Sequence, residues 1–340
     1  MKNVRLEKIY GNTEVKEYLE KRIENGNFSH AVVITGKSGF GKKTLVNDII
    51  CAMACVKDNT PCGECNICKK ISGGECVDIY TIRKPENKTT IPIDAIRDIY
   101  ASISYKPNDL DFKVYVIEDG DKIPPRTQNA LLKLLEEPPS GVYFFILCED
   151  ENKLLSTIRS RCETFTLTPF TASEIISFLQ KEGYTENLKT IAALSCGSLG
   201  TALKIASGDD EILARRTIAD KFVELLLERT GSEFEFIVYQ LENIKSAQEY
   251  FEICRAVLSA LRDIIMVKED AECALSYFSD IEEVEEYAQI YPCITLLSMC
   301  DILFDVLQNE TVNTRLSLLL TEYSSKLWKT KYNGDNKCQR

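Results

Sequence analysis

The 340-residue chain lacks any run of apolar residues close to the roughly 18 that a membrane-spanning helix needs, although 44% of its residues are hydrophobic. Residues 1–21 are charged throughout and lack the apolar core of a secretory signal peptide. These absences exclude a membrane role. We therefore expect a soluble protein that stays in the cytoplasm.

The chain also lacks an excess of positive charge. It has 41 lysines and arginines and 52 acidic residues, which gives a net charge of -11 at pH 7. Domains that bind nucleic acid on their own usually carry a basic face that displaces counterions from phosphates. The charge balance excludes a free-standing binder of this kind. Any contact with DNA is expected to be local or shared with partners.

Histidine is nearly absent, since His30 is the one histidine of the chain. It precedes the first expected core strand, where a role in packing or at the edge of a bound nucleotide is favoured over catalysis. Catalysis by a histidine is therefore not expected.

Cysteine, in contrast, is abundant, with 14 residues. In a long chain without a signal sequence they are expected to be reduced thiols, and clusters of them indicate metal sites. Four cysteines have the spacing C-x6-C-x2-C-x2-C: Cys55, Cys62, Cys65 and Cys68. Four thiolates without a nearby histidine or an open position predict a structural, tetrahedral zinc site. Cys51 and Cys76 flank the cluster and stay open as substitutes for one ligand.

A glycine-rich loop follows the apolar run 31–35 and precedes the helical pattern 45–56, which predicts strand, loop and helix. In a phosphate-binding loop, glycines let backbone N–H groups wrap the phosphates, and a lysine reaches the terminal ones. The residues in these positions are Gly36, Gly39, Gly41 and Lys42. A ligand-free turn rich in glycine and lysine is the alternative, which the flanking strand and helix disfavour.

The loop departs from the usual pattern at the magnesium position, where a Ser or Thr hydroxyl is expected and Lys43 stands. Thr44 comes one residue late, which rotates its side chain by roughly 100° on a helix. A second site is expected where the strand 113–117 ends in Glu118 and Asp119. Glu118 stands where an aspartate normally holds magnesium, and Asp119 where a catalytic glutamate is usual. These changes favour a degenerate nucleotide site over solvated acids.

Strands alternate with helices in the first half of the chain, which predicts a parallel α/β sheet. After Pro169 the pattern changes to short helices and then to long ones. We therefore expect three domains and a disordered tail. Their bounds are 1–168, with the cysteine module at about 51–76, then 169–208, 209–333 and, for the tail, 334–340.

A cysteine cluster that directly follows the helix after a phosphate-binding loop is an uncommon combination. Together with KVYVIEDGDKI, NALLKLLEEPP and the tripeptide Ser160-Arg161-Cys162, it resembles the AAA+ subunits of the bacterial clamp loader. These are the gamma/tau and delta-prime subunits of DNA polymerase III. IRDIYASISYKP, GSLGTAL and NTRLSLLL extend the resemblance over nearly the whole chain. It implies an AAA+ domain, a helical lid and a helical collar that packs against gamma/tau and delta subunits.

Four departures from that family concern the nucleotide site: Lys43, the pair Glu118-Asp119, Glu149 in place of a small polar sensor, and Gly200 in place of a sensor arginine. A glutamate repels a triphosphate, and the missing arginine removes a charge-assisted contact. The resemblance therefore implies a non-hydrolysing, delta-prime-type stator that helps load the sliding clamp onto primed DNA. Whether ATP or ADP still binds stays open, and a working gamma/tau-type ATPase is the alternative.

In this family the arginine of Ser-Arg-Cys reaches a neighbouring subunit's ATP site, so the resemblance implies that Arg161 is an arginine finger acting in trans. A surface arginine paired with a nearby acid is the alternative. The chain would then lack its own ATPase activity and serve as a component of the polymerase holoenzyme, a nucleotidyltransferase complex. Lys37, Lys42 and Lys43 could contact DNA or hold a vestigial nucleotide, whereas Arg97 is a weaker candidate for DNA.

Overall fold

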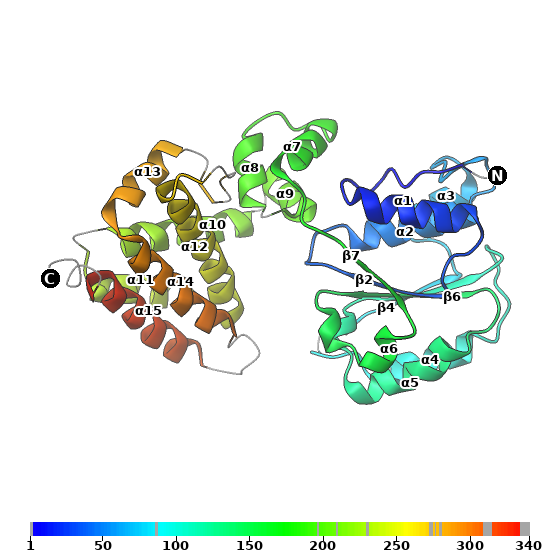
Figure 1. Ribbon diagram of the computed structural model, residues 1–340. Helices are drawn as coiled ribbons and strands as arrows, with labels where there is room; N and C mark the ends of the chain where they lie inside the picture. The colour runs from blue at the N-terminus through cyan, green and yellow to red at the C-terminus, as the bar shows by residue number, and fades with distance from the viewer. Residues whose placement is uncertain are drawn as a thin grey trace. The chain divides into compact units, whose positions relative to one another are not determined.

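The computed structural model describes residues 3–85, 88–195, 197–208, 210–228, 231–271, 275, 277–278, 281–308 and 315–333. The expected tail lies outside the described residues. The chain forms two compact units (Figure 1). Their bounds are Met1–Phe178 with Gly197–Gly200 for the first, and Leu179–Cys196 with Thr201–Arg340 for the second. The finer division into three domains stays a prediction.

The first unit is built on a five-stranded parallel sheet with the strand order β4-β5-β6-β2-β7. A parallel sheet needs crossover connections, and helices serve as crossovers here. The expected parallel α/β sheet is confirmed. Its strands are β2 (Ala31–Thr35), β4 (Ile79–Ile82), β5 (Lys113–Ile117), β6 (Val142–Cys148) and β7 (Glu163–Thr166).

Helices cover both faces of this sheet (Figure 1). Val32 and Ile34 of β2 belong to one buried apolar cluster, whereas Ala31 and Val33 belong to a second one. Successive strand residues point to opposite faces, so β2 contributes to both cores. The helices on the two faces are α1 (Thr13–Glu24), α2 (Lys42–Ala54) and α3 (Asn66–Ser72), and α4 (Ile93–Ser102), α5 (Pro125–Glu136) and α6 (Ser156–Arg159).

Short elements complete this part of the chain. A two-stranded parallel sheet joins the N-terminal segment to the cysteine module, with Asn3 opposite Asn59. Two 3-10 turns follow the ends of β5 and β6, and α7 leads out of the first unit. The bounds are β1 (Asn3–Val4), β3 (Asn59–Thr60), η1 (Gly120–Lys122), η2 (Glu151–Lys153) and α7 (Ala172–Lys181).

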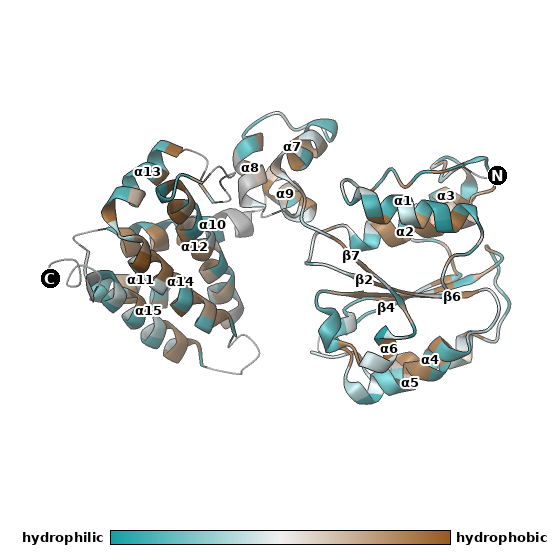
Figure 2. Cartoon of the chain, in the orientation of Figure 1, coloured by the Kyte–Doolittle hydropathy of each residue, from teal (hydrophilic) through white to brown (hydrophobic). Residues whose placement is uncertain are grey.

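The regular elements described in the second unit are all helices, as the sequence predicts. Phe236 packs edge to face on Phe222, with ring centroids 4.9 Å apart, and also contacts Trp328. Figure 2 shows hydrophobic residues concentrated on the strands of the sheet and on helices α12 and α14. The helices are α8 (Leu188–Leu194), α9 (Leu199–Ala206), α10 (Asp210–Leu227), α11 (Glu233–Asn243), α12 (Ala247–Lys268), α13 (Ile281–Ile290), α14 (Cys293–Gln308) and α15 (Leu316–Asn333).

Among the described residues, no single helix has the length and apolar composition to cross a membrane. Helices α13 and α14 have the required length and composition only when they are taken together, and the chain bends by 101° between them. Leu296 and Leu303 of α14 are fully buried in the helical core.

Candidate functional site

The phosphate-binding loop connects β2 to α2 at the carboxyl edge of the sheet, where positive φ angles are required. Gly36, Gly39 and Gly41 have φ values of 149°, 78° and 86°, a region that glycine adopts without a steric penalty. Lys42 begins α2, and its ammonium group donates to the carbonyls of Gly36 and Lys37. Burial lowers the pKa of Lys42, and nearby acids, Glu149 foremost, oppose the shift. The lysine is thus engaged within its own loop.

Lys43 contacts the acidic end of β5. Its Nζ lies 2.7 Å from Oε2 of Glu118, and the Glu118 side chain is 14% exposed. Thr44, the next residue of α2, is exposed. The predicted loop and acid are therefore brought together, but by an ammonium group rather than by a hydroxyl that could bind a metal ion.

Further carboxylates gather at the same edge. Asp119 adopts the left-handed conformation with φ 53°, and the Asp121 side chain is only 4% exposed. The Glu149 backbone N–H donates to Oδ1 of Asp121 at 3.4 Å. All three acids oppose the lowering of the Lys42 pKa by burial, so their negative charge acts on the loop. Such a field disfavours the approach of a triphosphate.

The four predicted cysteines come together next to α2. Their Sγ atoms lie within 4.8 Å of one another. Sγ of Cys62 accepts the Cys65 backbone N–H at 3.4 Å, and Sγ of Cys65 accepts the Cys68 N–H at 3.4 Å. The hydrogen bond from Cys65 contributes most to lowering the pKa of Cys62 to about 6. The cluster could hold a metal ion, and four thiolates fit zinc.

Among the described residues, the flanking cysteines, Cys51 and Cys76, are not members of this group of sulfurs. The Cys51 thiol instead donates to the carbonyl of Cys68 at 3.9 Å. The geometry therefore supports the set given by the sequence spacing.

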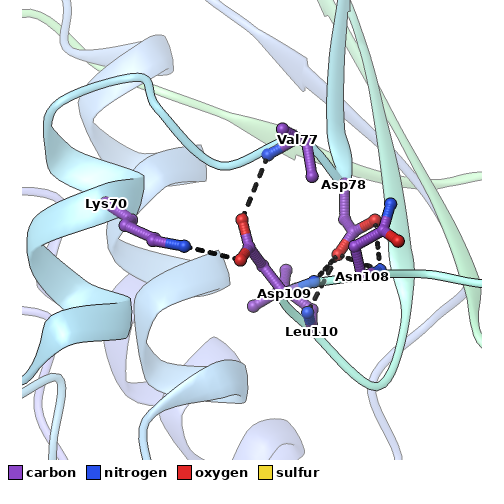
Figure 3. A network of polar contacts seen from close by, with 6 residues as sticks. All are labelled: Lys70, Val77, Asp78, Asn108, Asp109 and Leu110. Atoms are coloured by element: carbon purple, nitrogen blue, oxygen red, sulfur yellow. Dashed lines mark hydrogen bonds and ion pairs between the residues drawn. The ribbon is translucent and has the colours of Figure 1, made fainter.

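A polar network that the sequence did not indicate holds the cysteine module against the sheet (Figure 3). Lys70 of α3 pairs with Asp109 at 2.6 Å. The neighbouring carboxylate of Asp78 is fully buried and accepts three backbone N–H groups at 2.6 to 2.9 Å, those of Asn108, Asp109 and Leu110. Because no motif links these segments, only the fold shows that α3 is anchored here.

Arg161 follows α6 on the surface of the first unit. Its NH2 lies 2.5 Å from Oε1 of Glu136, and its NH1 donates to the Thr157 carbonyl at 2.8 Å. The side chain is 34% exposed. Within the isolated chain this arginine therefore has an acidic partner, as the alternative interpretation anticipates.

The remaining candidates lie apart from the loop or make local pairs. His30 precedes β2, whereas the phosphate-binding loop follows it, and Nε2 of His30 contacts the Leu135 carbonyl at 3.0 Å. Arg97 pairs with Asp94 at 2.9 Å on an exposed helix face. Both arrangements fit structural or solvated roles.

The first unit is a parallel α/β domain with a glycine-rich loop between β2 and α2, and Lys43 of this loop pairs with Glu118 after β5. Residues 11–171 match the family described as DNA polymerase III, delta subunit. Over this range the chain is similar to the clamp-loader subunits of DNA polymerase III. The resemblance drawn from the sequence is thus confirmed.

Relatives of both subunit types are similar to this chain. The gamma subunit of Buchnera aphidicola subsp. Schizaphis graminum is 34% identical, over 56% of this chain and 55% of that protein. The delta-prime subunit of Escherichia coli K12 is 30% identical, over 57% of this chain and 59% of that protein. The delta-prime subunit of Haemophilus influenzae is 25% identical, over 92% of this chain and 95% of that protein. The chain spans about half the length of the first curated relatives it matches, 55% to 57%.

Proposed function

We propose that this chain is a non-hydrolysing, delta-prime-type subunit of the clamp loader. In this role it assembles with gamma/tau and delta subunits in the cytoplasm and helps load the sliding clamp onto primed DNA. The observation that carries the proposal is the ion pair between Lys43 and Glu118.

The ion pair opposes magnesium binding for an electrostatic reason. Magnesium needs oxygen ligands in near-octahedral geometry, and Lys43 offers none from the hydroxyl position. Its ammonium already neutralises Glu118, and a divalent cation brought beside it would be repelled. Phosphoryl transfer depends on metal ions that neutralise charge on the β- and γ-phosphates. A loop without this ion is expected to lack turnover, whether or not it holds a nucleotide.

We assign Arg161 as an arginine finger that acts on the ATP site of a neighbouring subunit. Its pair with Glu136 lies at the surface and is partly exposed, so an assembled neighbour could exchange that carboxylate for phosphate oxygens at small cost. A guanidinium in this position stabilises the charge that develops during phosphoryl transfer. The chain would then contribute to ATP hydrolysis without carrying it out.

Assembly is supported by an apolar stripe on α14. Ile294, Leu297 and Phe304 are 69%, 52% and 50% exposed, and their spacing places them along one side of the helix. An exposed apolar stripe of this kind fits a contact with another helical domain. We assign this stripe to the helical collar, where it would contact the gamma/tau and delta subunits.

The test is magnesium-dependent ATP hydrolysis by the purified chain, with Lys42→Ala as the control for contaminating ATPases. We expect no turnover that depends on Lys42. Turnover that the variant abolishes would instead establish the gamma/tau-type alternative. Co-purification with gamma/tau and delta subunits is expected as well, and its absence would place the chain outside the loader.

A further inference from the structure

We propose that the phosphate-binding loop is held by a latch made of this chain's own backbone. The segment Ser198–Gly200, where α9 begins, fastens onto Gly39 and keeps its position without nucleotide. This latch deepens the proposed function and rests on it, because a fixed loop suits a subunit that does not cycle with ATP. Both parts belong to the first unit.

The latch is a contact between two glycines. The Gly200 N–H donates to the Gly39 carbonyl at 3.3 Å. A Cβ built on Gly200 would lie 3.1 Å from Cα of Gly39, and one built on Gly39 would lie 1.9 Å from Oγ of Ser198. Two segments some 160 residues apart in sequence therefore meet backbone to backbone, and any side chain at Gly39 would force them apart.

A second anchor fixes the other end of the segment. The Phe170 N–H, just after β7, donates to the Gly197 carbonyl at 3.0 Å. A Cβ on Gly197 would lie 2.5 Å from Cβ of Pro169, so this approach also requires glycine. The Phe170 ring packs edge to face on Phe40 of the loop, with centroids 6.5 Å apart. The segment is thus attached to the chain after β7 at one end and to the loop at the other.

The consequence follows from the rule that a ligand shifts a conformational equilibrium only by its different affinity for the two states. The hydrogen bond from Gly200 to Gly39 and the packing of Ser198, which is 5% exposed, hold the segment against the loop. A nucleotide would then add little to the stability of this contact. Segment 197–200 is expected to occupy the same position with and without nucleotide.

Hydrogen exchange of the full chain, followed by mass spectrometry, tests the latch directly. The Gly200 amide, which donates to Gly39, should exchange slowly without nucleotide, and saturating Mg·ATP should change the exchange rates of segment 197–200 by less than about twofold. Fast exchange that slows only when nucleotide is added would overturn the latch. The non-hydrolysing function would survive that result, because ATP turnover is measured separately.

Variants identify the contact. Gly39→Ala should speed exchange of 197–200 by about tenfold or more, because its methyl displaces Ser198. Gly26→Ala is the matched control, since Gly26 also has a positive φ, 67°, but has no atom within 4 Å of a built Cβ. Adding Ser198→Gly to Gly39→Ala removes the clash and should restore part of the protection. Equal effects of Gly26→Ala and Gly39→Ala would assign the change to backbone strain and refute the latch.

Discussion

The ammonium of Lys43 lies 2.7 Å from the carboxylate of Glu118, so the residue in the magnesium-binding hydroxyl position neutralises the acid in the second metal position. The two alterations compensate each other in charge. A cation is therefore retained at this point of the loop, but as part of the protein.

This pairing predicts the behaviour of Glu118→Gln. In a magnesium-dependent site, loss of this acid would abolish turnover, whereas here the ATPase rate of a reconstituted clamp loader should stay unchanged. The free energy of unfolding should fall by less than about 1 kcal/mol, because the Lys43 side chain is 66% exposed and solvent screens the pair. Steady-state ATPase assays and urea denaturation measure the two effects. A complex that loses its activity with this variant would contradict the proposal.

The sequence predicted the loop, the acids after β5 and the four cysteines, because each is a local pattern with a fixed chemical purpose. It did not predict that Lys43 meets Glu118. These residues follow β2 and β5, which are separated in the sheet by β6, so their contact depends on side-chain reach across a strand. The pairing of Gly39 with Gly200 likewise depends on where the chain returns after β7.

Arg161→Ala should reduce the ATPase rate of the reconstituted complex by about a thousandfold at the site it serves, the lower range for a trans arginine. Folding of the isolated chain should change little, because the pair with Glu136 is partly exposed. ATPase assays of the complex and thermal unfolding of the chain provide the comparison.

Glu136→Gln is the control that separates the two interpretations of this arginine. It removes the acidic partner but leaves the guanidinium in place. If Arg161 acts on a neighbour's nucleotide, the ATPase rate should stay near that of the unaltered complex or rise slightly. A loss equal to that of Arg161→Ala would show that the surface pair itself is what matters.

The cysteine cluster predicts about one zinc ion per chain, held by four thiolates. Cys65→Ser should lower the metal content and the free energy of unfolding, because a structural zinc site contributes directly to folding. Cys51→Ser is the matched control, since its sulfur lies outside the group and should leave the metal content unchanged. Elemental analysis and thermal unfolding measure both. Equal zinc loss in both variants would exclude this ligand set.

Asp48 predicts a pH-dependent stability. This residue of α2 is fully buried, its Oδ1 has no hydrogen-bond partner, and burial raises its pKa to about 6, against the hydrogen bond from the Lys8 N–H. The folded state therefore binds this proton more tightly than the unfolded chain, where the pKa is near 3.8. Its contribution is favourable below about pH 4 and is lost as pH rises through about 6.

Asp48→Asn removes this titration. The variant should be more stable than the unaltered chain at pH 8, by about 1 to 3 kcal/mol for a shift of this size, and nearly equal to it at pH 4. Urea denaturation at both pH values gives the difference. Asp109→Asn should behave in the opposite sense, because the hydrogen bond from Lys70 lowers the pKa of Asp109, and its contribution is lost as pH falls. A stability difference for Asp48→Asn that does not change with pH would show that the carboxyl group does not titrate in this range.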